Sequence, residues 1–217
     1  MSPRYDRTIV AGFAAALAAL LLFAWLANGV MRGEAIRFDL GARAAVHSLA
    51  SPGVTYVMLG FTWLGSVPCV VALAALLVWR FVKLGRMRAA IILVVATAGA
   101  EALDQVLKLI FHRPRPEAFF GFPDPITYSF PSGHAITAAS FYGVLAAIVA
   151  AREGRRAVRA AVWCAAALTA AGIGLSRVYL GVHYPSDVVA GYAAAVVWAA
   201  ALYAAYGIWR RRRAAPR

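Results

Sequence analysis

Residues 89–111 read AAIILVVATAGAEALDQVLKLIF, an apolar run that carries three charged residues close to its end. A hydrocarbon core about 30 Å thick is crossed by roughly 20 helical residues, so this run is long enough to span a membrane. Glu101, Asp104 and Lys108 are spaced so that they share one helix face. Ionisable groups at membrane depth are costly and usually face a polar interior, often as partners. The run therefore predicts a membrane helix with a polar site at one end.

The rest of the chain also has the composition of a membrane protein. Hydrophobic residues make up 63% of the 217 residues and charged residues 14%, whereas a soluble domain is about half apolar and a quarter charged. The length suits a single domain. We therefore expect one all-α domain over residues 1–217, an integral membrane bundle of six helices. The apolar segments that predict these helices are residues 8–30, 54–80, 89–111, 135–151, 158–175 and 188–209.

The placement of the basic residues predicts the orientation of the bundle. A net charge of +13 could indicate nucleic acid, but most Lys and Arg residues lie in short segments between apolar runs and at the C-terminus. Cytoplasmic connections of membrane proteins carry such an excess of positive charge. We expect both termini on the cytoplasmic side of the cell membrane and no nucleic acid partner. The basic segments are residues 4–7, 80–88, 152–159 and 210–217.

Residues 31–53, between the first two apolar segments, mix charged and apolar side chains. One interpretation is an amphipathic segment that lies at the outer membrane surface. The other is an irregular polar loop. The sequence leaves both open.

A first motif, K-x6-R-P, begins at Lys108 and ends at Arg115 and Pro116. Two cations near the predicted outer end of a span suit an anionic ligand, and Asp104 is placed to pair with Lys108. The alternative is that Lys108 only extends to the interface and that Arg113 and Arg115 anchor the chain there.

A second motif, Pro-Ser-Gly-His at residues 131–134, directly precedes the fourth apolar segment. Ser132 is a typical helix N-cap, and Gly133 allows the backbone to approach a ligand closely. Helix N-termini bind anions through unpaired N–H groups and the helix dipole. His134 would be placed to give a proton to a group that leaves this anion. The alternative is an ordinary turn.

A third motif, S-R-x5-H-x3-D, comprises Ser176, Arg177, His183 and Asp187. His183 and Asp187 are four residues apart and share one helix face. Asp187 is therefore able to accept a hydrogen bond from one ring nitrogen of His183 and leave the other free as a nucleophile. A purely structural hydrogen bond is the alternative.

The three motifs occur in this order and on the same predicted side of the membrane, the outer or periplasmic one. Together they resemble the type 2 phosphatidic acid phosphatase family, which shares its core with vanadium haloperoxidases. The resemblance covers residues 108–187 at motif level, and the six-span layout covers nearly the whole chain. It implies an enzyme that removes phosphate from a membrane lipid without a metal, in an active site at the outer face.

The resemblance also assigns roles to the motif residues. His183 would attack phosphorus and become phosphohistidine, Asp187 would orient it, and His134 would protonate the departing oxygen and later activate water. No metal and no other cofactor is expected, because fixed cations and a helix N-terminus can replace Mg²⁺ at a phosphoryl group. The expected phosphate-binding residues are Lys108, Arg115, Ser132, Gly133 and Arg177.

The sequence leaves the lipid and the acceptor open. The pattern of Glu101, Asp104 and Lys108 before residues 112–116 resembles bacterial undecaprenyl-diphosphatases, which favours undecaprenyl diphosphate. Phosphatidylglycerophosphate, phosphatidate and lipid A phosphates are alternatives, as is phosphoryl transfer to a second lipid. An anion transporter is disfavoured because the charges lie at one face and helices broken by Gly or Pro are not expected. The six spans disfavour a haloperoxidase. The oligomeric state is left open.

Overall fold

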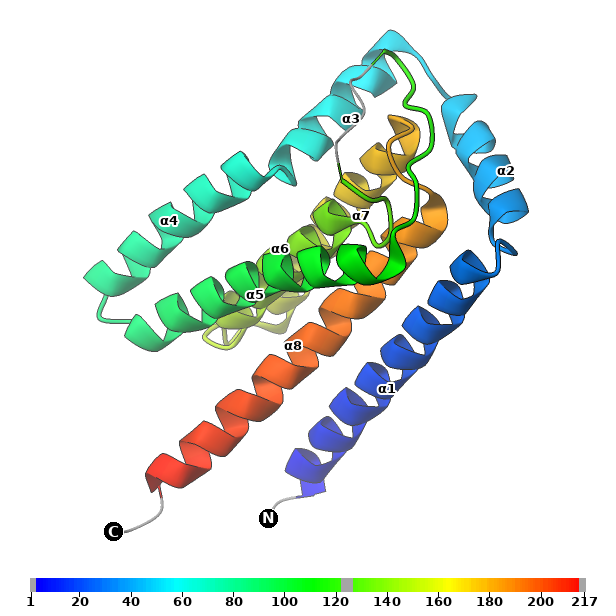
Figure 1. Ribbon diagram of the computed structural model, residues 1–217. Helices are drawn as coiled ribbons and strands as arrows, with labels where there is room; N and C mark the ends of the chain where they lie inside the picture. The colour runs from blue at the N-terminus through cyan, green and yellow to red at the C-terminus, as the bar shows by residue number, and fades with distance from the viewer. Residues whose placement is uncertain (1–2, 122–126, 215–217) are drawn as a thin grey trace.

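The computed structural model describes residues 3–121 and 127–214, and this part of the chain folds into eight helices with no strand (Figure 1). The all-α class is thus confirmed. The helices are α1 (Pro3–Met31), α2 (Ile36–His47), α3 (Pro52–Leu64), α4 (Val67–Lys83), α5 (Met87–Phe111), α6 (Gly133–Ala150), α7 (Arg156–Tyr179) and α8 (Pro185–Ala214).

The lengths and composition of these helices fit a membrane bundle. Five of them, α1, α5, α6, α7 and α8, are long and apolar enough to cross a membrane. α3 and α4 pass the same test as a pair that is bent by 53° at the break between them. Counted as one broken span, this pair brings the total within the described residues to the predicted six.

The break in the second span contradicts the expectation that broken helices are lacking. α4 begins with Pro68 in its first turn, where a missing N–H costs nothing, and the Ser66 side chain accepts from the Cys69 N–H (3.4 Å). A Cβ on Gly65, the residue at the bend, would collide with Ile173 of α7 and lie 3.2 Å from the His134 ring. The bend lets α3 pack on α7 and α4 on α5, and it brings the backbone against α6.

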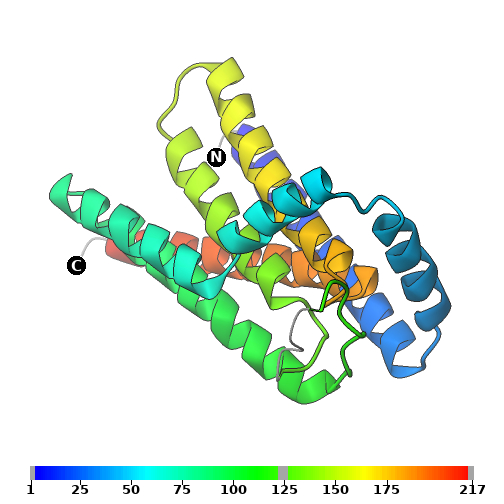
Figure 2. The same cartoon turned by 90° about the horizontal axis from the view of Figure 1, so that it is seen from above.

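α6 lies at the centre of the bundle and contacts α5, α7 and α8, whereas α1 contacts α8 (Figure 1 and Figure 2). Small residues allow helices in a membrane to approach closely. A Cβ on Gly191 of α8 would lie 2.8 Å from the Ser132 carbonyl oxygen and 2.9 Å from the Ala135 Cβ. Gly99 of α5 likewise lies against the Trp198 ring of α8. These close contacts bring the start of α6 next to the start of α8.

Residues 36–47 form the helix α2, so the interpretation of this part of the chain as an irregular loop is wrong. The helix has an unusual distribution of side chains. Phe38 and Leu40 are exposed, at 68% and 48%, while Asp39 is fully buried and Arg43 is nearly so. α2 therefore presents apolar side chains outward and two charges inward.

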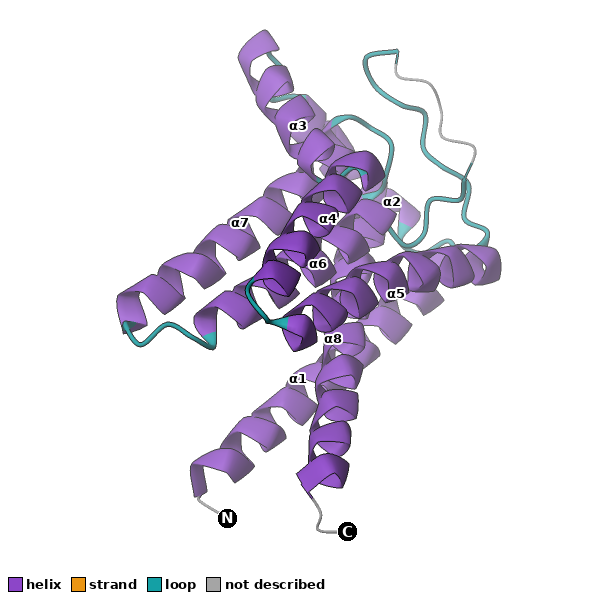
Figure 3. Cartoon of the chain, turned by 90° about the vertical axis from the view of Figure 1, so that its left-hand side faces the viewer, coloured by secondary structure: helices purple, strands orange, loops and turns teal. Residues whose placement is uncertain are grey.

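The start of α1 and the end of α8 lie at one end of the bundle, and the connections that carry the three motifs lie at the other (Figure 1 and Figure 3). The motif end holds α2, residues 112–121 and 127–132, and the turn between α7 and α8. The short turns between α4 and α5 and between α6 and α7 lie toward the termini. All three motifs thus share one end of the bundle.

The predicted orientation is testable with single cysteines in a variant that lacks Cys69 and Cys164. Glu117→Cys places an exposed thiol in the loop at the motif end, and Leu84→Cys places an exposed thiol in the α4–α5 turn. An impermeant maleimide should label Glu117→Cys in intact cells and Leu84→Cys only after lysis, because basic connections stay in the cytoplasm. The opposite pattern would overturn the predicted topology.

Candidate active site

His183 lies in the tight turn between α7 and α8 and is 2% exposed. The turn forms because Val182 and His183 both donate their N–H groups to the Arg177 carbonyl, at 3.1 and 3.3 Å. Gly181 has φ +80°, and a Cβ there would lie 2.6 Å from the Phe119 nitrogen, so this position needs glycine. The turn thus holds the histidine inside the protein, against the loop that follows α5.

The two ring nitrogens of His183 face different partners. Nε2 lies 3.0 Å from a guanidinium nitrogen of Arg115, and Nδ1 lies 3.4 Å from Oδ2 of Asp187 and 3.5 Å from the Ser129 hydroxyl. A guanidinium only donates, so Nε2 must carry the lone pair and the ring proton belongs on Nδ1, beside the carboxylate. This is the tautomer that a nucleophile at Nε2 requires.

The surroundings of His183 also keep its ring neutral. Burial lowers the pKa of His183 well below its ordinary value, and the positive charges of Arg115, Arg177 and Lys108 lower it further. Neutral imidazole has the free electron pair that attack on an electrophile needs. The same cations that would attract a phosphate therefore keep the histidine reactive.

Asp187 lies in the first turn of α8 and is fully buried. Its Oδ2 accepts from the Tyr184 N–H (2.8 Å) and from the Ser129 hydroxyl, and its Oδ1 accepts from Arg113 (2.6 Å). These bonds fix both oxygens of the carboxylate. The predicted pairing of His183 with Asp187 is therefore a contact of 3.4 Å inside a larger network.

The three predicted phosphate-binding cations converge from separate helices and loops. Arg115 is held by the Thr127 carbonyl (2.6 Å) and the Val182 carbonyl (2.9 Å) while it contacts His183. The buried Lys108 donates to Asp104 at 2.7 Å, as its i, i+4 spacing predicted. Arg177 of α7 donates to the Thr62 hydroxyl of α3 at 2.5 Å.

Residues 131–134 lie beside these cations at the start of α6. Ser132 is the N-cap residue by position, but its hydroxyl does not cap the helix, contrary to the usual role of serine there. Its N–H donates instead to the Asp187 carbonyl (2.9 Å). A Cβ on Gly133 would lie 2.6 Å from the Asp104 carboxylate, so only glycine fits. His134 is within electrostatic range of His183 and of the three cations.

Three buried polar atoms at this site have no partner among the described residues: the Ser132 hydroxyl oxygen, the Nε of Arg177 and Oδ1 of Asp104. Buried polar groups in proteins nearly always have a hydrogen-bond partner. The two unpaired donors, beside three cations and a helix N-terminus, therefore point to a bound anion. Phosphate oxygens would accept from both the Ser132 hydroxyl and Arg177 Nε.

Several residues that hold the site were missed by the sequence analysis. Arg113, for which the sequence suggested only the alternative of interfacial anchoring, is 9% exposed and bonds to both Asp187 and Asp39. Ser129 and Thr62 bond to motif residues from outside the motifs. Arg113 stands beside the first motif, which is a usable signal, whereas nothing in the sequence distinguishes Asp39 from the other charges of residues 31–53.

A group of at least three His, Cys, Asp or Glu side chains suited to a metal ion is not found in residues 3–121 and 127–214. The arrangement instead offers a buried neutral imidazole, three cations and a second histidine near one point. Such a set can stabilise the charge of a phosphoryl group and supply both a nucleophile and a proton donor.

The chain is similar to known membrane phosphatases. A crystal structure of a transmembrane PAP2 type phosphatidylglycerolphosphate phosphatase from Bacillus subtilis superposes with a TM-score of 0.80 and 25% identity, covering 90% of this chain and 96% of that one. Phosphatidylglycerophosphatase B of Bacillus subtilis is 28% identical over 79% of this chain and 85% of its own length. An undecaprenyl-diphosphatase of Sulfolobus acidocaldarius is 32% identical over 47% of this chain and 48% of its own. The sequence pattern of the PAP2 superfamily matches residues 89–211, and the chain belongs to that family.

Proposed function

We propose that this protein hydrolyses a lipid phosphate or diphosphate without a metal, through a phosphohistidine intermediate. The observation that carries the proposal is the position of His183, buried with Nδ1 toward Asp187 and Nε2 toward Arg115. Membership of the PAP2 superfamily and the lipid phosphatase names of the relatives support it.

In the first step the phosphoryl group binds between Lys108, Arg115 and Arg177, with the Ser132 hydroxyl donating to one of its oxygens. Nε2 of His183 attacks phosphorus, so a P–N bond forms as the P–O bond to the lipid breaks. The cations neutralise the charge on the phosphoryl oxygens, which is the main demand of phosphoryl transfer.

His134 gives its proton to the departing lipid oxygen in this step. The proton on Nδ1 of His183 stays beside the Asp187 carboxylate, which balances the positive charge that the phosphorylated ring acquires. In the second step His134 takes a proton from water, the water oxygen attacks phosphorus, and the P–N bond breaks. Phosphate leaves, and both histidines return to their starting protonation.

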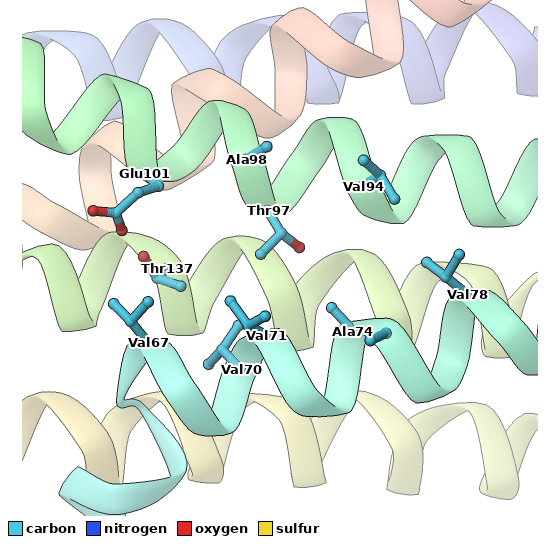
Figure 4. A pocket seen from close by; sticks show the side chains of 11 residues that line it. Val67, Val70, Val71, Ala74, Val78, Val94, Thr97, Ala98, Glu101 and Thr137 are labelled. Carbon is cyan, nitrogen blue, oxygen red and sulfur yellow. The ribbon is translucent and has the colours of Figure 1, made fainter.

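An apolar pocket of about 380 Å³ between α4 and α5 supports a lipid substrate (Figure 4). Glu101 and Thr137 lie at one end of it, and Glu101 is one helical turn before Asp104, the partner of Lys108. The pocket thus lies between two apolar helices with one end about a helical turn from Asp104, which suits a hydrocarbon chain. The other lining residues are Val67, Val70, Val71, Ala74, Ala75, Val78, Val94, Thr97 and Ala98.

Two head groups are candidates. Phosphatidylglycerophosphate is supported by the Bacillus subtilis relatives, whose similarity extends over most of both chains. Undecaprenyl diphosphate, which the residues before Arg115 favoured, is supported by a relative that matches about half of the chain. The longer similarity makes phosphatidylglycerophosphate the first substrate to assay, and product analysis would separate hydrolysis from transfer to a second lipid.

Replacing the nucleophile tests the mechanism directly. His183→Ala should reduce phosphate release to the background rate, because no other side chain supplies the attacking nitrogen, and Asp187→Asn should be milder. Brief incubation of wild type with 32P-labelled substrate should trap acid-labile, base-stable label on the protein. The exposed His112, replaced by Asn, is the control and should keep wild-type activity. Turnover of His183→Ala within a few-fold of wild type would rule the mechanism out.

Metal independence gives a second test. Activity should persist in excess EDTA, and vanadate should inhibit it, because a trigonal-bipyramidal vanadate fits the same cations as the transferring phosphoryl group. Arg177→Ala should weaken vanadate inhibition as well as turnover. Loss of activity in EDTA that Mg²⁺ restores would contradict the role given to these cations.

The lowered pKa of His183 predicts how stability depends on pH. Below the unfolded pKa of about 6.5 the unfolded chain binds a proton that the folded protein does not, so the free energy of unfolding falls by up to about 1.4 kcal/mol per pH unit. Thermal unfolding in detergent should therefore show a larger loss of stability between pH 7.5 and 5.5 for wild type than for His183→Gln. Equal losses would show that His183 is not held neutral.

A further inference from the structure

α2 is not one of the motif-bearing elements, yet its two buried charges reach the candidate site. Asp39 is 0% exposed and Arg43 is 9% exposed, on a helix whose apolar side chains face outward. Arg43 bonds to the Glu117 and Gly181 carbonyls, in the two loops that carry Arg115 and His183. Burying a charge is costly unless it is paired, so the partners of Asp39 indicate what this charge does.

Asp39 binds the first turn of α8. Its Oδ1 accepts from the Ser186 N–H (3.0 Å), and its Oδ2 accepts from the Ser186 hydroxyl (2.6 Å). The first N–H groups of a helix have no partner within the helix and are usually satisfied by a nearby side chain. Here a carboxylate from a helix 147 residues away takes that role. Asp39 therefore fixes the end of α8 at the residue next to Asp187.

Arg113 joins the two carboxylates. One terminal nitrogen of its guanidinium donates to Oδ1 of Asp187 (2.6 Å) and to the Ser186 hydroxyl (2.8 Å), and the other donates to Oδ2 of Asp39 (2.7 Å). The guanidinium also lies 4.0 Å from the centre of the Tyr184 ring. A planar fork with this many contacts has one orientation, which a lysine could not reproduce.

We propose that Arg113 and Asp39 are positioning residues for the candidate reaction, a role that rests on the proposed function. Arg113 occupies Oδ1 of Asp187, which leaves Oδ2 facing Nδ1 of His183. Asp39 holds both Arg113 and Ser186, so the carboxylate is fixed from two sides. Without them Oδ1 of Asp187 has no partner among the described residues, and only the Tyr184 N–H and the Ser129 hydroxyl hold the carboxylate, through Oδ2. The carboxylate is then less well fixed beside Nδ1 of His183, and Nε2 is less well aligned for attack.

The test is a double-mutant analysis of activity. Arg113→Gln and Asp39→Asn are made in wild type and in the Asp187→Asn background, and kcat and KM are measured with phosphatidylglycerophosphate in detergent micelles. In wild type each change should lower kcat, Arg113→Gln by about a hundredfold, and leave KM nearly unchanged, because misalignment affects the reaction more than binding. In the Asp187→Asn background neither should lower kcat by more than about twofold, since the carboxylate they position is absent.

Two further variants keep the test decisive. Glu34→Gln makes the same carboxylate-to-amide change at an exposed position just before α2 and should leave kcat unchanged. Arg113→Lys retains the charge but not the fork, so it should resemble Arg113→Gln rather than wild type. If Arg113→Gln does not fold, Arg113→Lys and Asp39→Asn decide the outcome.

The proposal is overturned if Arg113→Lys and Asp39→Asn keep wild-type kcat, or if they lower it by the same factor in both backgrounds, which would show a general structural role. Failure of the proposed function gives a different result. In that case Asp187→Asn and His183→Ala themselves would retain activity, and no 32P would be trapped on the protein.

Discussion

Two buried carboxylates share the guanidinium of Arg113, and the arrangement of the whole motif end depends on this interaction. Asp39 and Asp187 are each 74 residues from Arg113 in sequence, and the three residues come from α2, from the loop after α5 and from α8. Removing one partner of a buried ion pair typically costs about 3–5 kcal/mol, because a charge is left without compensation. The pairing therefore constrains how these three segments meet, and with them the turn that carries His183.

The need of buried charges for polar partners also explains why the site lies at one end of the bundle. Away from the motif end the spans are apolar, and small residues such as Gly99 let them pack closely. At the motif end the backbone leaves helical geometry, and unpaired N–H and carbonyl groups appear. Arg115 uses two of these carbonyls, those of Thr127 and Val182, as its supports. Arg115 is thus held by carbonyl groups that, in a regular membrane helix, would be bonded within the helix.

The broken second span contributes to both the candidate phosphate site and the apolar pocket. Its first half supplies Thr62, which supports Arg177, and its second half lines the apolar pocket beside α5. Gly65, at the bend, lies against His134. The bend lets one half pack on α7 and the other on α5, so the two halves border the candidate phosphate site and the apolar pocket.

Much of this protein could be predicted from residues close together in sequence. Apolar runs of sufficient length predicted the membrane bundle, because lipid admits few other structures, and the i, i+4 spacing predicted the contacts of Lys108 with Asp104 and of His183 with Asp187. The bend at Gly65 and the roles of Asp39 and Arg113 could not be predicted in this way. They depend on partners on other helices, and whether a charge is exposed or buried against an opposite charge is decided only when the helices pack together.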